Sequence, residues 1–182
     1  EYLETWNYQK ELVLKRYQQD IPDTLLLVEH PPVYTFGRAE KSPSLVHSGI
    51  PIYQVERGGK MTYHGPGQLV GYPIFLMTST RIDFFLRKLE EILILTLAEF
   101  GLIGEQDTQG TGVWVENKKI ASLGIAVKKW VTYHGFALNV NTDLAAFNAI
   151  SPCGFPSSIM TSMQALLHDS IDLKKVKLII KN

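Results

Sequence analysis

Cys153 is the only cysteine in this chain of 182 residues, and it stands between Pro152 and Gly154. Proline and glycine place it in a turn rather than in the middle of a helix or strand. A thiol in such a turn is a candidate nucleophile if a neighbour lowers its pKa, because the thiolate is the reactive form. The alternative is a free thiol packed as a small hydrophobic side chain. A lone cysteine also excludes an intrachain disulfide.

Lys119 is the candidate neighbour of that thiol. Strands are predicted at residues 111–115 and 120–127, joined by a turn at 116–118. Because side chains alternate along a strand, Lys119 shares the apolar face of the second strand, whereas Lys118 lies in the turn. A buried ammonium is costly without a partner, and a thiolate beside it would stabilise both charges. The alternative is a lysine that extends past the strand end into water.

Residues 57–68, with the sequence RGGKMTYHGPGQ, combine glycines with polar side chains. Glycine lets the backbone take positive φ and approach a ligand closely. Strands are predicted on either side, at 50–55 and 69–76, and Pro73 in the second suits an edge strand or a bulge. A hairpin needs only a few linking residues, so this segment is a candidate binding loop. It has neither P-loop nor dinucleotide-binding spacing, and the alternative is two turns that join strands.

Five segments of the chain together resemble the octanoyltransferases of lipoate biosynthesis, the lipoyl(octanoyl) transferase family. The glycine segment matches the family pattern RGG-x-x-T-aromatic-H, and the cysteine matches its P-C-G turn. Each motif alone is weak, but all five occur in the family's order and spacing. The five segments are residues 29–38, 57–72, 119–124, 134–139 and 152–154.

The resemblance implies that Cys153 and Lys119 are catalytic. Cys153 would take an octanoyl group from octanoyl-acyl carrier protein and pass it to a lysine of a lipoyl domain, in 2-oxoacid dehydrogenases and the glycine cleavage H protein. Lys119 would lower the pKa of the thiol and exchange protons. No cofactor or nucleotide is implied. The implied substrate-binding residues are Arg57, Gly58, Gly59, Lys60, Met61, Thr62, Tyr63, His64, Ser122, Leu123, Gly124, Gly135, Phe136 and Ala137.

Two other functions stay open on the sequence alone. An ATP-dependent lipoate or biotin protein ligase would share a glycine loop and a lysine, but it would form an acyl-adenylate and would not need Cys153. A non-catalytic acyl-binding module would leave that thiol inert. The five histidines are scattered, so no metal site is predicted. His64 is the histidine expected to touch substrate, whereas His47 and His168 are expected at the surface.

Composition and charge favour one enzyme domain, residues 1–182. A formal net charge of +0 and a pI of about 7.2 indicate neither a nucleic-acid nor an anionic-membrane partner. No apolar stretch approaches the length of a membrane span, and the polar start does not resemble a signal peptide. A cytoplasmic location is therefore expected, which the lone free thiol also suits.

The expected elements belong to the α+β class: a single domain with a mainly antiparallel or mixed sheet flanked by helices. The resemblance implies a fold similar to the catalytic domains of biotin and lipoate protein ligases. Four lysines between residues 174 and 181 predict a solvated helix face. Helices are predicted at 5–17, 83–100 and, capped by residues 142–143, up to 147; further strands are predicted at 24–29, 33–36 and 131–140.

Overall fold

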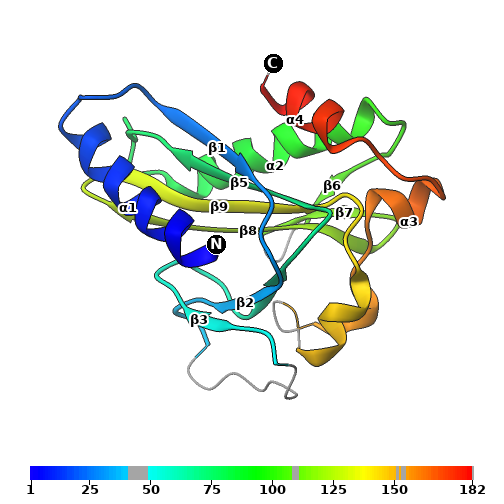
Figure 1. Cartoon of the computed structure of the whole chain (residues 1–182). Coiled ribbons are helices and arrows are strands. Elements are labelled where there is room, and N and C mark those ends of the chain that lie inside the picture. Colours follow the sequence, from blue (N-terminus) through cyan, green and yellow to red (C-terminus); the bar gives the residue numbers. More distant parts are fainter. Residues whose placement is uncertain (41–48, 108–110, 151, 153–154, 182) are drawn as a thin grey trace.

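The computed structural model describes residues 1–40, 49–107, 111–150, 152 and 155–181. Its centre is a six-stranded antiparallel sheet with the strand order β1-β5-β9-β8-β7-β6 (Figure 1). The long strands β8 and β9 form its middle. The strands are β1 (Thr24–Val28), β5 (Gln68–Ile74), β6 (Glu105–Gln106), β7 (Val113–Val115), β8 (Lys118–Lys128) and β9 (Val131–Asn139).

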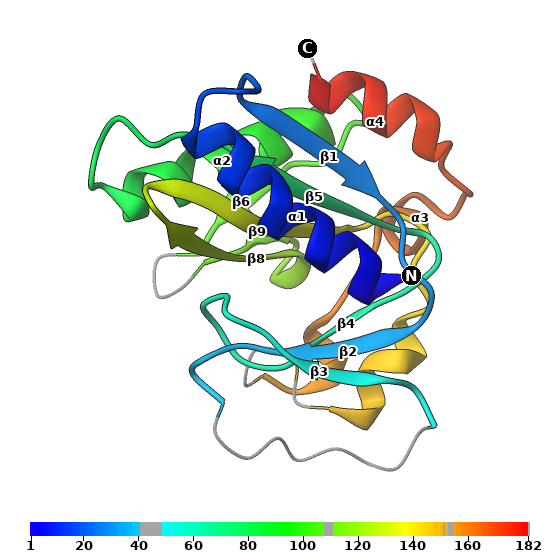
Figure 2. The ribbon, with the colours of Figure 1, turned by 60° about the vertical axis from the view of Figure 1, so that its left-hand side comes forward.

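A second sheet of three strands lies below the large one in Figure 2. It has the order β3-β2-β4, built from β2 (Val33–Phe36), β3 (Ile52–Gln54) and β4 (Thr62–His64). β2 pairs in parallel with β3 and antiparallel with β4. The segment predicted as a binding loop therefore contains a strand, and this is a correction: pairing with β2, distant in sequence, gives residues 62–64 an extended form.

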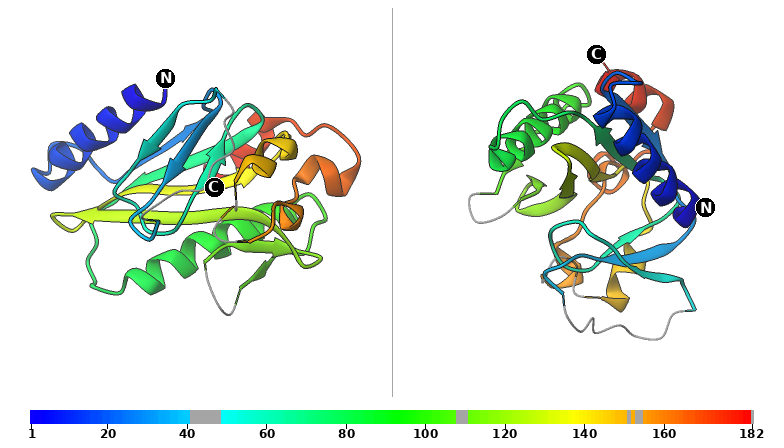
Figure 3. Two further views of the ribbon diagram at one scale, coloured as in Figure 1. Left: turned by 90° about the horizontal axis from the view of Figure 1, so that it is seen from below. Right: turned by 90° about the vertical axis from the view of Figure 1, so that its left-hand side faces the viewer.

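Helices cover both faces of the large sheet (Figure 3). α2 (Ile82–Ala98) and α4 (Leu173–Lys181) pack on the main core, which includes Ile125 of β8. α1 (Tyr2–Tyr17) packs on Ala126, the next residue of the same strand. Because neighbouring side chains point to opposite faces of a strand, α1 lies on the opposite face from α2 and α4, which is also the face of the small sheet.

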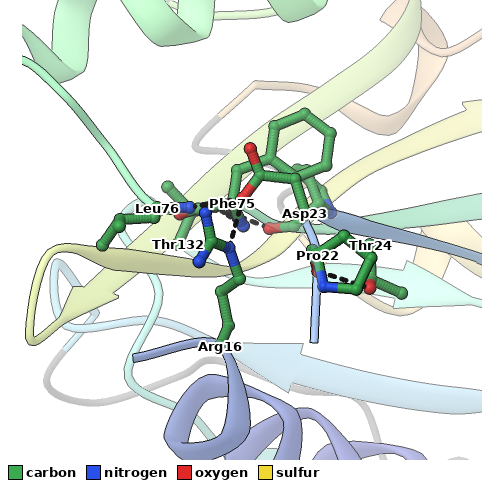
Figure 4. Close-up of polar contacts among 8 residues, drawn as sticks. Arg16, Pro22, Asp23, Thr24, Phe75, Leu76 and Thr132 are labelled. Carbon is green, nitrogen blue, oxygen red and sulfur yellow. Dashed lines mark hydrogen bonds and ion pairs between the residues drawn. The ribbon is translucent and has the colours of Figure 1, made fainter. Parts of the chain in front are cut away.

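The end of α1 is tied to the large sheet by Asp23, whose carboxylate accepts hydrogen bonds from Arg16 Nε (2.6 Å) and Leu76 N (2.9 Å), as Figure 4 shows. Nearby, the regular ladder between β5 and β9 ends at the pair Gly71–Phe136, before Pro73. Beyond the end of that ladder, a side-chain hydrogen bond joins the two segments: the hydroxyl of Thr132 donates to the Pro73 carbonyl (2.7 Å). Both alternatives predicted at Pro73 are wrong: β5 pairs with β1 in an unshifted register through Pro73, and it lies between β1 and β9 rather than at an edge.

Most predicted elements are present with shifted ends, and the α+β class is confirmed. α1 begins at Tyr2 instead of residue 5, and α2 ends at Ala98 instead of residue 100. The predicted three-residue turn is a two-residue turn of Glu116 and Asn117, both at positive φ, so that Lys118 already pairs in β8. That geometry matches the right-handed twist of the hairpin.

The chain after β9 runs through short helices. They are the 3₁₀ helices η1 (Leu144–Ala149) and η3 (Ser157–Ile159) and the α-helix α3 (Met163–Leu167). The carboxylate of Asp143 caps η1 by accepting from the backbone N–H of Ala145 (2.9 Å), as predicted. None of the helices in the described part of the chain combines the length and apolar character needed to cross a bilayer.

Candidate active site

A narrow cavity lies between the two sheets and the N-terminal turn of α1. Strands β4, β5, β8 and β9 all contribute to its walls. Of the residues predicted to bind substrate, those that line it are Arg57, Gly59, Thr62, His64, Ser122, Leu123, Gly124, Gly135, Phe136 and Ala137. Four other residues line the cavity without having been predicted to bind substrate: Tyr2, Val70, Tyr72 and His134.

The predicted binding residues that do not line the cavity are Gly58, Lys60, Met61 and Tyr63. Strand alternation explains two of them, because Met61 and Tyr63 point into a separate apolar cluster with Phe147, whereas Thr62 and His64 face the cavity. The side chain of Lys60 is exposed. Gly58 docks the loop by donating its N–H to the Ile125 carbonyl of β8 (3.0 Å).

Arg57 shapes this loop from within. Its guanidinium donates to the backbone carbonyl and hydroxyl of Thr35 (2.8 and 2.9 Å) and to the carbonyls of Gly58 (3.0 Å) and Lys60 (2.8 Å). Only 8% of the residue is exposed. The loop is thus folded around a buried cation, and Gly59 takes φ +83°, a value that suits glycine.

Two glycines let the loop and the strands approach each other. A Cβ added to Gly124 of β8 would lie 2.8 Å from the carbonyl oxygen of Gly58. A Cβ added to Gly135 of β9 would lie 2.1 Å from the carbonyl oxygen of Gly71. Any larger residue at these positions would have to push backbone aside, so the narrow cavity depends on them.

His64 is held at both ring nitrogens. Nδ1 lies 2.8 Å from Gln68 Oε1, and Nε2 lies 3.3 Å from the Thr35 hydroxyl. The amide nitrogen of Gln68 donates to the Tyr63 carbonyl and to Asn139 Oδ1, so its oxygen faces His64 and Nδ1 carries the proton. Burial lowers the pKa of His64 to about 3. The imidazole is therefore neutral near pH 7, and it fixes the cavity wall.

His134 lies on the opposite wall in an unusual backbone conformation, with φ +55° inside β9. The backbone N–H of His134 donates to Gln9 Oε1 of α1 (2.8 Å). Burial lowers the pKa of its imidazole to about 4.

The hydroxyl of Tyr72, on β5, lies 2.7 Å from Nε2 of His30. Alternation along β5 could have pointed to Tyr72, but no local signal marks Tyr2, which reaches the cavity from the first turn of α1.

Lys119 is 3% exposed, so its predicted inward direction is confirmed, and Lys118 is exposed. The ammonium of Lys119 donates to the Thr111 carbonyl (3.1 Å) and lies 5.7 and 5.6 Å from the ring centroids of Trp114 and Phe155. Simple alternation along β8 does not explain why Lys119 is buried. The register between β7 and β8 shifts next to Lys119, which interrupts the alternation on which the prediction depended.

Cys153 lies outside the described residues, but the chain on its C-terminal side packs against Lys119. The ring of Phe155 faces the ammonium, and Phe155 N donates to the Pro152 carbonyl (3.0 Å). Further along, Thr161 N donates to the Lys119 carbonyl (2.9 Å). Lys119 itself does not line the cavity, although Ser122 on the same strand does.

Two further histidines, His47 and His168, were predicted to lie at the surface. His168 is exposed, as expected, and takes the left-handed conformation at the end of α3. His47 lies outside the described residues. Within the described ranges, no group of three or more His, Cys, Asp and Glu side chains could hold a metal ion.

The sequence matches the family model of the lipoyl protein ligase A/B catalytic domain over residues 1–182. The chain belongs to this family. An octanoyltransferase of Gloeobacter violaceus is 51% identical over 168 residues, covering 90% of this chain and 76% of the relative. An octanoyltransferase of Synechococcus elongatus is 49% identical over 170 residues, covering 90% and 73%. The resemblance predicted from the motifs is confirmed.

The fold is also that of the family. A putative lipoate protein ligase of T. acidophilum with bound lipoic acid superposes with a TM-score of 0.73 at 16% identity, covering 95% of this chain and 77% of that one. Identity this low shows a shared fold alone. The predicted similarity to the lipoate protein ligase catalytic domain is therefore confirmed.

Proposed function

We propose that the chain, as one catalytic domain, transfers an octanoyl group from octanoyl-acyl carrier protein to a lipoyl-domain lysine through a thioester on Cys153. The reaction class, octanoyl transfer by an acyltransferase in protein lipoylation, follows from the family and from relatives named octanoyltransferase. The donor, the thioester and the residue roles are our proposal. The acceptors we propose are the lipoyl domains of 2-oxoacid dehydrogenases and the glycine cleavage H protein, and a cytoplasmic location stays a prediction.

The observation that carries the proposal is the buried ammonium of Lys119. It is 3% exposed, and among the described residues its Nζ donates one hydrogen bond, to the neutral carbonyl of Thr111. A buried cation of this kind favours an anion nearby. Phe155, two residues after Cys153, packs against it. A thiolate at Cys153 would supply the missing charge, and the ammonium would lower the pKa of the thiol.

The two steps balance as follows. In the first, the Cys153 thiolate attacks the carbonyl carbon of the donor thioester, and the bond to the pantetheine sulfur breaks while Lys119 protonates that leaving sulfur. In the second, the amine of the acceptor lysine attacks the new thioester, Lys119 takes up a proton from the amine, and the Cys153 thiolate leaves. The octanoyl chain occupies the cavity between the sheets, with His64 and Arg57 holding one wall.

Intact-mass measurement after incubation with octanoyl-acyl carrier protein, without ATP, tests this reading. Wild type should gain one octanoyl group in a thioester that hydroxylamine removes, and Cys153→Ala should gain none. Since the chain has one cysteine, no peptide mapping is needed. An adduct on Cys153→Ala would refute the nucleophile. Transfer only with ATP and free octanoate would establish a ligase instead, and binding without any transfer would establish an acyl-binding module.

A further inference from the structure

We infer that Glu90 is a positioning residue for Lys119, acting through the backbone of Thr111 and Gly112. Glu90 lies on α2 and is 0% exposed, on a helix whose other buried positions include Leu93 and Leu97. A carboxylate is seldom fully buried unless it is paired. Glu90 binds the backbone segment that contacts Lys119. This inference rests on the proposed function, in which Lys119 moves the protons.

Both oxygens of the Glu90 carboxylate are used. Oε1 accepts from the backbone N–H of Gly112 (2.8 Å), and Oε2 accepts from Nη1 of Arg87 (2.7 Å). The same Arg87 nitrogen donates to the carbonyl of Asp107 (3.1 Å). The Arg87–Glu90 pair thus holds the backbone at two points, Asp107 and Gly112, on the approach to β7.

The held backbone is in direct contact with the lysine. Thr111, which precedes Gly112, accepts the hydrogen bond from Lys119 Nζ (3.1 Å). A Cβ added to Gly112 would lie 2.7 Å from Lys119 Cε and 3.0 Å from Nζ. Gly112 therefore forms the surface along which the lysine side chain lies. Any displacement of Gly112 moves both that surface and the carbonyl that orients the ammonium.

Orientation of this ammonium decides the rate in the proposed mechanism. A proton donor must come within hydrogen-bond reach of the atom it serves. A shift of about 1 Å can cost on the order of 10²-fold in rate. Lys119 has a flexible stem of four carbons, so it needs a fixed acceptor to hold one direction. Glu90 supplies that fixed point from α2 without touching the reacting atoms.

The test uses the full chain with Glu90→Leu, which removes the acceptor, and Glu90→Gln, whose amide oxygen can still accept from Gly112. Glu91→Gln is the matched control, since Glu91 is the adjacent residue of α2, half exposed and paired with Lys88. The readouts are the pH dependence of alkylation of the only thiol by iodoacetamide, and kcat and KM for octanoyl transfer from octanoyl-acyl carrier protein.

We expect Glu90→Leu to move the alkylation midpoint to higher pH and to lower kcat by about 10- to 100-fold, with KM within about twofold of wild type. Glu90→Gln should restore most of both, and Glu91→Gln should match wild type. Glu90→Leu on the Lys119→Ala background should add no further loss, because the two residues act in series. If Glu90→Leu does not fold, Gly112→Ala carries the test, since its Cβ displaces Lys119 while the carboxylate remains.

Several results would overturn the inference: a wild-type pH profile in a folded Glu90→Leu or Gly112→Ala variant, equal loss in Glu91→Gln, no rescue by Glu90→Gln, or full additivity with Lys119→Ala. The proposed function fails in a different way. Normal transfer by Lys119→Ala would refute the role of the lysine itself. Impaired transfer by Lys119→Ala beside a normal Glu90→Leu would refute only the positioning role.

Discussion

Replacing Lys119 with alanine should nearly abolish octanoyl transfer while leaving the fold intact. The side chain is buried against Trp114 and Phe155, and its ammonium donates a hydrogen bond to the Thr111 carbonyl. In the proposed mechanism the Cys153 thiolate would lose its cationic neighbour, so the pKa of the thiol should rise. The donor of protons to the leaving thiol is lost at the same time.

The expected loss of rate is larger than the expected loss of stability. Removing a positioned acid or base costs on the order of 10²–10⁴-fold in rate, which at about 1.36 kcal/mol per tenfold raises the barrier by about 2.7–5.4 kcal/mol. In the folded state, one carbonyl loses its donor, at a cost of about 1–3 kcal/mol. Removal of a buried charge offsets part of that cost. The change in the free energy of unfolding should therefore be within about 2 kcal/mol.

The assay compares Lys119→Ala, Lys119→Arg and Lys118→Ala by alkylation rate against pH, octanoyl transfer rate and chemical denaturation. Lys118 is the exposed neighbour, so Lys118→Ala should behave like wild type. Arginine keeps the charge but neither gives up nor takes a proton near neutral pH, so Lys119→Arg should keep part of the thiol reactivity and lose transfer. A damaging Lys118→Ala beside a normal Lys119→Ala would refute the assignment.

His64→Ala should weaken the use of octanoyl-acyl carrier protein without moving the pH midpoint of alkylation, because both ring nitrogens are already bonded, to Gln68 and Thr35; a shift as large as in the lysine variant would give histidine the activating role. Gly124→Ala should reduce octanoyl binding, measured by calorimetry, while alkylation stays normal, since the added Cβ would lie 2.8 Å from the Gly58 carbonyl; unchanged affinity would contradict this. The free energy of unfolding should fall as pH drops below the ordinary histidine pKa of 6.5 toward about 3, because the imidazole of the unfolded chain binds a proton that buried His64 does not. Chemical denaturation at pH 7 and 4.5 should show a smaller decrease for His64→Gln than for wild type. Equal decreases in the two proteins would contradict this role of His64.

Local patterns in the sequence determined the elements and the residue types of the site. The apolar spacing of α2, the hairpin that carries Lys119 and the cap of η1 each depend on neighbouring residues, so a single stretch of chain predicts them. The same holds for the five motifs, whose order alone indicates the family. The exposed direction of Lys118, beside the hairpin turn, also follows from a few adjacent positions, whereas the surroundings of Lys119 depend on the register shift between β7 and β8.

Pairing between distant segments decided the rest. Residues 62–64 are a strand only because β2 lies beside them, and that strand then turns Met61 and Tyr63 away from the cavity. The bulge next to Lys119 arises from the register between β7 and β8. Tyr2 and Glu90 carry no motif: Tyr2 reaches the cavity from α1 and Glu90 reaches the backbone of Gly112 from α2, because the two helices pack on opposite faces of one sheet. Contacts between residues far apart in sequence depend on how whole elements pack, which no local pattern encodes.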